Sequence, residues 1–413
     1  MSITGLTRLG SANAYDTVIG NLETRQSNLT KMQEQLSTGK KITTPGDDPT
    51  GAAQAERALN RLSRIATDQR ALDAQKNAIT TAESTLGDIT DALQQVRDLV
   101  AGAGNASYSN AERKTVADQI AGLSQRILSL ANTQDSNGQP LFAALGSALK
   151  PFAGPATSPD YSFNGLPGTN ATGTYTIPAS LDGESAFMLQ PARDAVYNVQ
   201  ITNSGTAPNL ISSPVTMTSS AAVTGSSYSI AVTAFDPVAG TATYDLTETP
   251  TSGSPTTTPG ITVPWTKASG FTVTGMQGLT MSVSGTPTVG DTLSVTPNSS
   301  VFSTVDKAAT DIANATTSAA ASQAVAQALH NIDISLGRIS AIRGQAGDLL
   351  NRADIISSSN DKRNIEQESN RSNAEDADMV KTISQFQNQT TGYQAALQSY
   401  AQIQKLSLFN YIS

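Results

Sequence analysis

The chain of 413 residues contains no cysteine and a single histidine, His330. The lack of cysteine excludes disulfide bonds and thiolate metal sites, and one histidine argues against histidine-rich metal sites and a histidine-centred active site. Aromatic residues make up 5% of the chain and charged residues 15%, and the net charge is −8. No block of Lys or Arg is present, which argues against a nucleic-acid binder. No apolar run approaches the roughly 20 residues that span a bilayer.

The N-terminal residues 1–16 also lack the apolar stretch of a cleavable secretion signal. Two locations therefore stay open: the cytosol, and the outside of the cell after export by a route that reads no cleaved signal. Two short motif matches, Ser37–Lys40 (S-x-x-K) and Asp135–Gly138 (part of a calcium loop), lack their partner motifs, and we interpret them as a helix end and a turn. We predict no catalytic, cofactor-binding or metal-binding residues.

The middle of the chain differs in composition from its two flanks. Residues 151–300 contain 15 of the 18 prolines but only ten charged residues. Short β-branched stretches bounded by Gly, Pro and Asn predict strands, and residues 249–259 are expected to form a loop. The predicted strands are 228–234, 241–247, 260–263 and 279–283. Because the flanks show helical periodicity, we predict an α+β multidomain fold, in which an elongated α-helical coiled-coil rod from both chain ends carries an inserted all-β domain.

The N-terminal flank predicts three helices. The first contains a row of side chains spaced alternately three and four apart, which turns one face toward a partner helix. This row is Tyr15, Val18, Leu22, Arg25, Leu29, Met32 and Leu36. Gly39 is expected to end the helix. Asp48 and Pro49 predict the start of a long second helix, with a carboxylate cap followed by proline in the first turn. The third helix carries a row from Val116 to Leu130.

The C-terminal flank mirrors this pattern. One row runs from Val325 to Leu350, and residues 357–373, which show little periodicity, are either helix or a joint. The last row consists of Met379, Ile383, Phe386, Tyr393, Leu397 and Tyr400 and is interrupted at Thr390. A helix with one narrow apolar row is marginal in water, so both terminal helices need a partner. Docking within the chain and contact between molecules are both possible, and the position at the chain ends favours contact between molecules.

Both ends of the chain resemble those of the bacterial flagellin family. The segment Gln33–Leu59 is similar to the family's N-terminal signature, in which one helix ends at Ser-x-Gly-Lys and the next begins after Asp-Asp-Pro. The segment Ser384–Ser413 resembles the family's other end. Two details favour the branch of hook-associated protein 3, the hook–filament junction protein. They are the proline-bearing stretch Thr44–Pro49 and the ending Leu406–Tyr411.

The edges of the middle segment are also similar to that branch. Asn137–Phe142 followed by Pro151–Gly154 resembles a motif of the junction proteins, although Pro140 stands where an aromatic residue is common. The segment Gly285–Leu293, with Val301 and Phe302 after it, resembles the closing strands of their β domain. Residues 202–278 match less specifically.

The resemblance implies three structural layers. Residues 1–44 and 372–413 would be terminal coiled-coil helices of an inner tube, 45–150 and 301–371 a long-helix rod domain, and 151–300 an inserted β domain. It further implies an assembly interface on the terminal helices. The residues expected there are Leu22, Leu29, Met32, Leu36, Ile383, Phe386, Tyr393, Leu397, Tyr400, Leu408 and Phe409.

The function implied by the resemblance is that of a structural adaptor, not an enzyme, that joins the hook to the flagellin filament through coiled-coil and rod packing. The implied partners are hook-associated protein 1, flagellin, copies of the chain in a ring, a cytosolic export chaperone and the type III flagellar export apparatus. Neither nucleic-acid binding nor membrane insertion is expected, and no cofactor is expected. The implied location is extracellular, at the hook–filament junction, after secretion without a cleaved signal peptide.

Two alternatives remain. The chain is similar enough to flagellin to be the filament subunit itself. A more distant alternative is an adhesin built on the β domain, against which the single Trp265 and the low aromatic content argue, because sugar sites usually need aromatic platforms.

Overall fold

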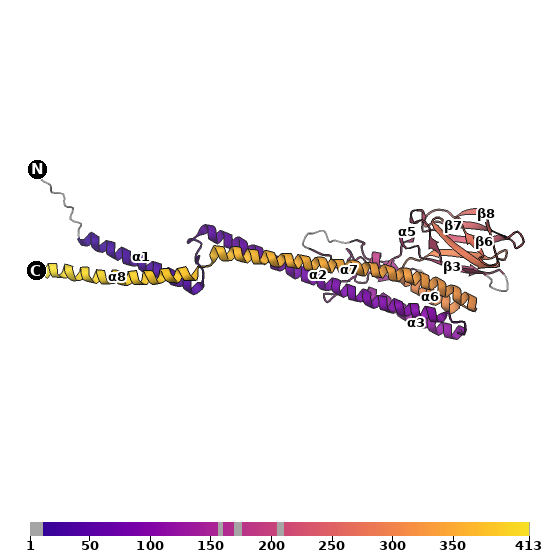
Figure 1. Ribbon diagram of the computed structural model, residues 1–413, viewed down its shortest axis with the longest axis horizontal. Helices are drawn as coiled ribbons and strands as arrows, with labels where there is room; N and C mark the ends of the chain where they lie inside the picture. The colour runs from indigo at the N-terminus through magenta and orange to yellow at the C-terminus, as the bar shows by residue number, and fades with distance from the viewer. Residues whose placement is uncertain (1–10, 156–159, 169–175, 205–209, 413) are drawn as a thin grey trace, which may run out of the picture. The chain divides into compact units, whose positions relative to one another are not determined.

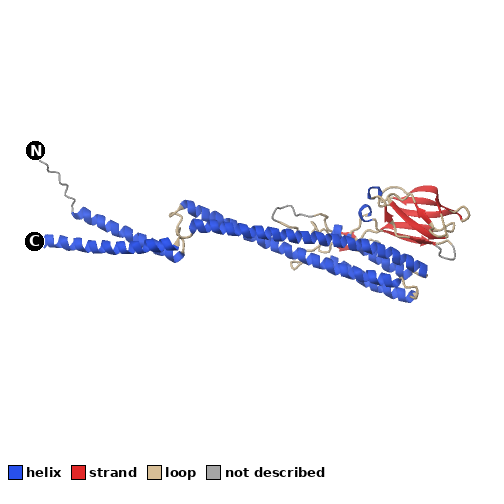
Figure 2. Ribbon diagram, in the orientation of Figure 1, coloured by secondary structure: helices blue, strands red, loops and turns tan. Residues whose placement is uncertain are grey.

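The computed structural model describes residues 11–155, 160–168, 176–204 and 210–412, and for residues 11–15 and 403–412 it describes the backbone only. The chain packs into two compact units, a terminal unit of residues 1–70 with 357–413 and a central unit of residues 71–356. Long helices form both flanks and the strands come between them in sequence (Figure 1, Figure 2), which confirms the predicted α+β multidomain class. The long helices are α1 (Ser11–Thr38), α2 (Pro49–Ala103), α3 (Asn110–Ala131), α6 (Val301–Asn314), α7 (Ser318–Glu375) and α8 (Met379–Ile412).

The start of α2 follows the predicted capping pattern. Oδ1 of Asp48 accepts hydrogen bonds from the backbone N–H groups of Thr50 (3.1 Å) and Gly51 (3.0 Å), and Pro49 is the first helical residue. These two bonds satisfy donors that the first turn of a helix leaves without a partner. α2 then continues unbroken to Ala103.

Residues 357–373, which showed little apolar periodicity, belong to α7. Their contacts with α2 in the terminal unit are polar. The side-chain amide of Gln69 donates to Oγ of Ser357 (3.0 Å) and accepts from Asn360 (3.1 Å), and Arg61 donates to Oε1 of Gln367 (3.3 Å). Because hydrogen bonds replace apolar packing here, the hydrophobic pattern used to predict helices is weak although the helix is continuous.

In the central unit, α2, α3, α6 and α7 share one hydrophobic core. Apolar residues of α2 recur at intervals of seven from Ile65 to Val100, and those in this unit are buried, with Ile79, Leu86, Leu93 and Val100 fully buried. Ion pairs flank this core along α2 and α7, for example the two contacts of Arg343 with Oε1 of Glu83 at 2.7 and 3.1 Å. In this unit, the row of α2 therefore forms part of the core of a helix bundle.

From Tyr197 onward, the inserted segment forms two antiparallel sheets around a second core. Earlier residues of the same segment, including Phe152 and Phe187, pack into the helical core. A five-stranded sheet has the order β3-β11-β6-β7-β8, and a four-stranded sheet has the order β4-β10-β5 with β9 paired to β10. The strands are β1 (Phe152–Ala153), β2 (Ser162–Phe163), β3 (Tyr197–Thr202), β4 (Leu210–Ser212), β5 (Thr216–Met217), β6 (Ser227–Asp236), β7 (Thr241–Thr249), β8 (Thr256–Pro264), β9 (Phe271–Val273), β10 (Leu279–Gly285) and β11 (Thr292–Pro297).

The predicted loop at 249–259 is largely wrong. β7 ends at Thr249 and β8 begins at Thr256, so the connection is only 250–255. β8 is the edge strand of its sheet and is mostly exposed, so its polar, proline-containing sequence needs no second partner. A bond between the hydroxyls of Thr247 and Thr257 (2.9 Å) supports the pairing.

Val301 and Phe302 do not belong to a closing strand. They begin α6, whose N-cap is Ser300, and a reciprocal pair of hydrogen bonds joins Ser300 to Ser303. With Ser303 in place of the usual Glu or Gln, this capping box is a weak sequence signal, so the helix start was not predicted. The inserted segment also contains three short helical turns that strand periodicity did not predict: α4 (Gly183–Phe187), α5 (Pro191–Asp194) and η1 (Ser220–Ala222).

Candidate assembly interface

The terminal helices α1 and α8 lie side by side (Figure 1). In α1 the half-buried positions form the row predicted from the heptad spacing. Its described members are Val18, Leu22, Arg25, Leu29, Met32 and Leu36. From Asp16 to Thr38, no side chain of α1 is fully buried. The α1–α8 pair therefore buries its apolar row only in part, which leaves more apolar area available for further contacts.

In α8 the structure separates the predicted row into two faces. Phe386, Tyr393 and Tyr400 are half-buried, together with Gln389 and Ala396, on the face that meets α1. Ile383 and Leu397 are instead exposed, at 44% and 42%, and Met379 is 41% exposed. The side chains of Leu408 and Phe409 lie outside the described residues. Ile383 and Leu397 thus lie outside the α1–α8 seam, and their part in assembly stays a prediction.

A polar layer interrupts the seam near its middle. The guanidinium of Arg25 lies over Gly392 of α8, so closely that a Cβ added to Gly392 would lie 2.8 Å from Nη1 of Arg25. Sequence analysis placed Arg25 in the row but did not identify Gly392. The apolar row of α8 is interrupted between Phe386 and Tyr393, and this interruption could have pointed to Gly392. The missing side chain of the glycine leaves space for the long side chain of Arg25.

The segments that connect α1 to α2 and α7 to α8 pair with each other. Gly39 ends α1 with a φ of +71°, as expected for a helix-terminating glycine. The backbone N–H of Lys41 donates to the carbonyl of Glu375 (2.8 Å), that of Ala377 donates to Gly39 (2.8 Å), and Lys40 forms an ion pair with Glu375. This pairing holds together the C-terminal end of α1 and the segment that leads into α8.

Asp47 holds the first of these connections. Its carboxylate accepts hydrogen bonds from Nζ of Lys31 (2.6 Å), from the backbone N–H of Thr44 (3.0 Å) and from both donors of Thr43. Lys31 first, and then the N–H of Thr44, hold the pKa of Asp47 well below its ordinary value. Asp47 thus stabilises the turn that connects α1 to α2.

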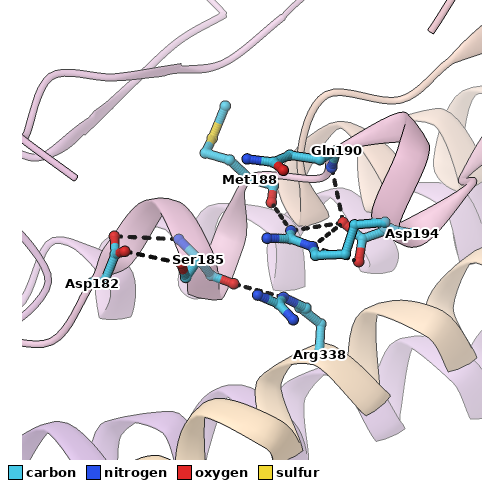
Figure 3. A network of polar contacts seen from close by, with 7 residues as sticks. Asp182, Ser185, Met188, Gln190, Asp194 and Arg338 are labelled. Atoms are coloured by element: carbon cyan, nitrogen blue, oxygen red, sulfur yellow. Dashed lines mark hydrogen bonds and ion pairs between the residues drawn. The ribbon is translucent and has the colours of Figure 1, made fainter. Parts of the chain in front are cut away.

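A second polar network fastens the inserted segment to α7 in the central unit (Figure 3). Nε of Arg338 on α7 donates to the carbonyl of Ser185 in α4 (2.7 Å), and Asp182 caps α4 by accepting from the backbone N–H groups of Glu184 (3.1 Å) and Ser185 (3.3 Å). Asp194 in α5 accepts from the backbone N–H of Gln190 (2.8 Å). Burial, and next the charge of Arg193, lower the pKa of Arg338. Arg338 thus ties α4 to α7, and Asp194 holds the turn of α5 beside it in sequence.

The described residues contain no group of three or more His, Asp or Glu side chains placed to hold a metal ion. None of the helices in the described ranges is both long and apolar enough to cross a bilayer. Among the described residues, the partly exposed apolar row of the α1–α8 pair is the surface best suited to contact with other macromolecules.

The comparisons with known proteins agree with this architecture. The family model of the bacterial flagellin N-terminal helical region matches residues 11–146. Flagellar hook-associated protein 3 of Salmonella typhimurium is 31% identical over 150 residues, which are 35% of this chain and 46% of that protein. The chain thus spans about half the length of the curated relatives it matches.

Solved structures extend the likeness over the inserted segment. The crystal structure of flagellar hook-associated protein 3 from Legionella pneumophila aligns with a TM-score of 0.60 and 27% identity over 76% of this chain and 97% of that chain. The flagellar junction protein from the same organism aligns with a TM-score of 0.58 and 25% identity over 73% of this chain and 99% of that chain. The matched helical region and these structures together relate the chain to the bacterial flagellin family.

Proposed function

We propose that this chain is a structural adaptor of the bacterial flagellum that joins the hook to the flagellin filament. The observation that carries the proposal is the extent of the structural likeness. Two solved flagellar proteins, one called hook-associated protein 3 and the other a junction protein, align over 97% and 99% of their lengths. Helices and insertion are matched together, so the likeness is not restricted to the helical signature shared with flagellins.

The α1–α8 pair is the proposed assembly interface. It offers the half-buried row around Leu29 and Phe386 and, beside it, the exposed Ile383 and Leu397. Burying apolar area on neighbouring molecules contributes roughly 25 cal/mol per Å², part of which is offset by the entropy lost in ordering the terminal segments. The full proposed set keeps Leu22, Met32, Leu36, Tyr393, Tyr400, Leu408 and Phe409.

The proposed partners are hook-associated protein 1 on the hook side, flagellin on the filament side and further copies of the chain in a ring. Before assembly, a cytosolic chaperone would cover the C-terminal helix, and the type III flagellar export apparatus would secrete the chain without cleaving a signal. The proposed location is therefore the hook–filament junction outside the cell. The adaptor role involves no chemical reaction and no cofactor.

Immunogold labelling of intact flagella tests the proposal and separates it from the flagellin alternative. An antibody against the inserted segment should label a single spot at the hook end of each flagellum. Labelling along the whole filament would instead identify the chain as the filament subunit. Purified chain should also fail to form long filaments on its own, whereas a flagellin would polymerise.

A further inference from the structure

One side of the α1–α8 pair carries a groove that contains an unpaired cation. The groove has a volume of about 500 Å³ and is lined mainly by polar side chains. These are Asn21, Thr24, Arg25 and Asn28 of α1 with Gln389 and Ser399 of α8. No described residue accepts a hydrogen bond or forms an ion pair with the guanidinium of Arg25, although this side chain is half-buried.

A half-buried guanidinium has five donors and no acceptor, so it is best satisfied by a carboxylate, which binds it through two parallel hydrogen bonds. The α8 helix offers none, because residues 379–412 contain no Asp or Glu. The groove is thus suited to an acidic side chain from another molecule.

The opposite face of α1 carries such side chains. Asp16, Glu23 and Glu34 are the acidic residues of α1, and all three are exposed. At about 100° per residue, spacings of 7 and 11 bring the three onto one stripe, and this stripe lies roughly 160–180° around the helix from Arg25. The acidic stripe and the cationic groove therefore belong to the same helix but cannot meet within one chain.

We propose that the acidic stripe of one copy docks into the groove of the next copy, with Glu23 of the first pairing with Arg25 of the second. This inference rests on the proposed function and adds the contact by which copies of the chain join each other. Because the two surfaces differ, the contact is heterologous, and repeating it builds a ring or a helical array rather than a closed two-fold dimer. Charge complementarity also sets the register, as a polar residue does within an otherwise apolar coiled-coil seam.

A charge exchange tests the pairing in a strain that lacks the chromosomal copy. Arg25→Glu alone and Glu23→Arg alone should each reduce the fraction of cells with filaments by about tenfold, because each places like charges opposite one another. The double variant should restore most of that loss. Residues 23 and 25 do not face each other on one helix, so the rescue can only come from contact between copies. A double variant no better than the single variants would overturn the pairing.

Cysteine crosslinking gives an independent readout, since the chain has no native cysteine. In assembled flagella, Glu23→Cys with Asn28→Cys should form an oxidised ladder of crosslinked copies, while each single variant should stay uncrosslinked. The two positions point to different sides of α1, so no disulfide can form within one chain. Assembled flagella without a ladder would overturn the inference while leaving the adaptor role intact. If a ladder forms but immunogold labelling places the chain along the whole filament, the contact between copies is supported and the junction role is rejected.

Discussion

At the scale of single residues, charged side chains are few and several of them serve as anchors. Asp47 organises the connection after α1, and Arg338 fastens α4 to α7. Arg113 is 4% exposed and donates to the backbone carbonyl of Tyr108 (2.7 Å) and to Oδ1 of Asn110 (2.8 Å), and so holds the start of α3. Removing such a donor leaves buried acceptors unsatisfied, so these sites matter more than their number suggests.

Asp47 gives the first prediction. Because its pKa is lowered in the folded chain, the stabilisation it contributes is present above its unfolded pKa of about 4 and is lost as the pH falls toward the lower folded value. We expect the amides of Thr43 and Thr44 to exchange faster with solvent below about pH 4. Asp47→Asn should produce that faster exchange already at neutral pH, once exchange rates are corrected for pH.

The neighbouring Asp48→Asn is the matched control for Asp47→Asn. It also removes one carboxylate charge, but asparagine caps a helix about as well as aspartate, so the amides of Thr50 and Gly51 should keep their protection. If Asp47→Asn and Asp48→Asn reduced the protection of Thr43 and Thr44 equally, the loss of one negative charge would explain the effect, and the hydrogen bonds to Asp47 would not be what holds the turn.

Tyr161 gives the second prediction. Its hydroxyl donates to Oδ2 of Asp306 (2.5 Å), whose other oxygen accepts from Ser124 (2.5 Å). Burial first, and then Asp306, raise the pKa of Tyr161, so its contribution to stability is present below about pH 10 and is lost as the pH rises above that. We expect the melting temperature to fall above about pH 10, and to fall less steeply in Tyr161→Phe. The variant should also lose about 1 kcal/mol at neutral pH, and an unchanged alkaline slope would contradict the assignment.

At the scale of elements, apolar periodicity predicted the existence of the long helices but not every contact they make. In α2, apolar residues spaced seven apart indicate one continuous helix, and each of them in the central unit is buried. α8 is different, since it carries two neighbouring apolar rows, one with Phe386 and Tyr393 and one with Ile383 and Leu397. Spacing alone cannot tell which row meets α1, because that depends on the partner surface. The first part of β8, residues 256–259, was predicted as loop for a related reason, since an edge strand needs little apolar sequence; the strand predicted at 260–263 lies within β8.

The two rows of α8 lead to the third prediction, which compares Leu29→Asp with Leu397→Asp. Leu29 is half-buried in the α1–α8 seam, so a charge there should destabilise the terminal unit by about 1–3 kcal/mol. Leu397 is exposed, so its change should alter the stability of the isolated chain by less than about 0.5 kcal/mol. Thermal melting and hydrogen exchange of the purified variants measure both effects.

Assembly separates the two roles of these residues. If Ile383 and Leu397 contact neighbouring molecules, Leu397→Asp should prevent filament growth although the isolated chain is folded normally. Gln394→Asp, which adds the same charge at an exposed polar position of α8, is the control and should leave growth unchanged. Normal filaments on Leu397→Asp would remove this row from the proposed interface, and melting unchanged in Leu29→Asp would remove Leu29 from the seam.

At the scale of the whole molecule, the central unit contains two cores that share no residue. Hydrogen bonds connect the sheets to α7 and α6. The carbonyl of Tyr197 accepts from Gln327 (2.9 Å) and Asn331 (3.1 Å) of α7. The backbone N–H of Ser212 in β4 donates to Oε1 of Gln323 in α7 (2.6 Å), and Asn298 donates to Oγ1 of Thr304 in α6 (3.3 Å). The chain enters the sheet on β3 and leaves it on β11, and these two strands are paired neighbours. The residues between β3 and β11 are therefore a separable part whose removal leaves the helical core complete.

Replacing residues 200–294 by Gly-Gly tests this separability. Val199 and Val295 are opposite each other in the β3–β11 register, so a two-residue turn can join them while the anchors at Tyr197 and Asn298 stay in place. Because the buried residues of the helical core are all retained, the helical melting transition should shift by only a few degrees and the shortened chain should still be secreted and support filaments. A folded, secreted variant that supports no filaments would mean that the β sheets are part of the junction itself and not a peripheral addition.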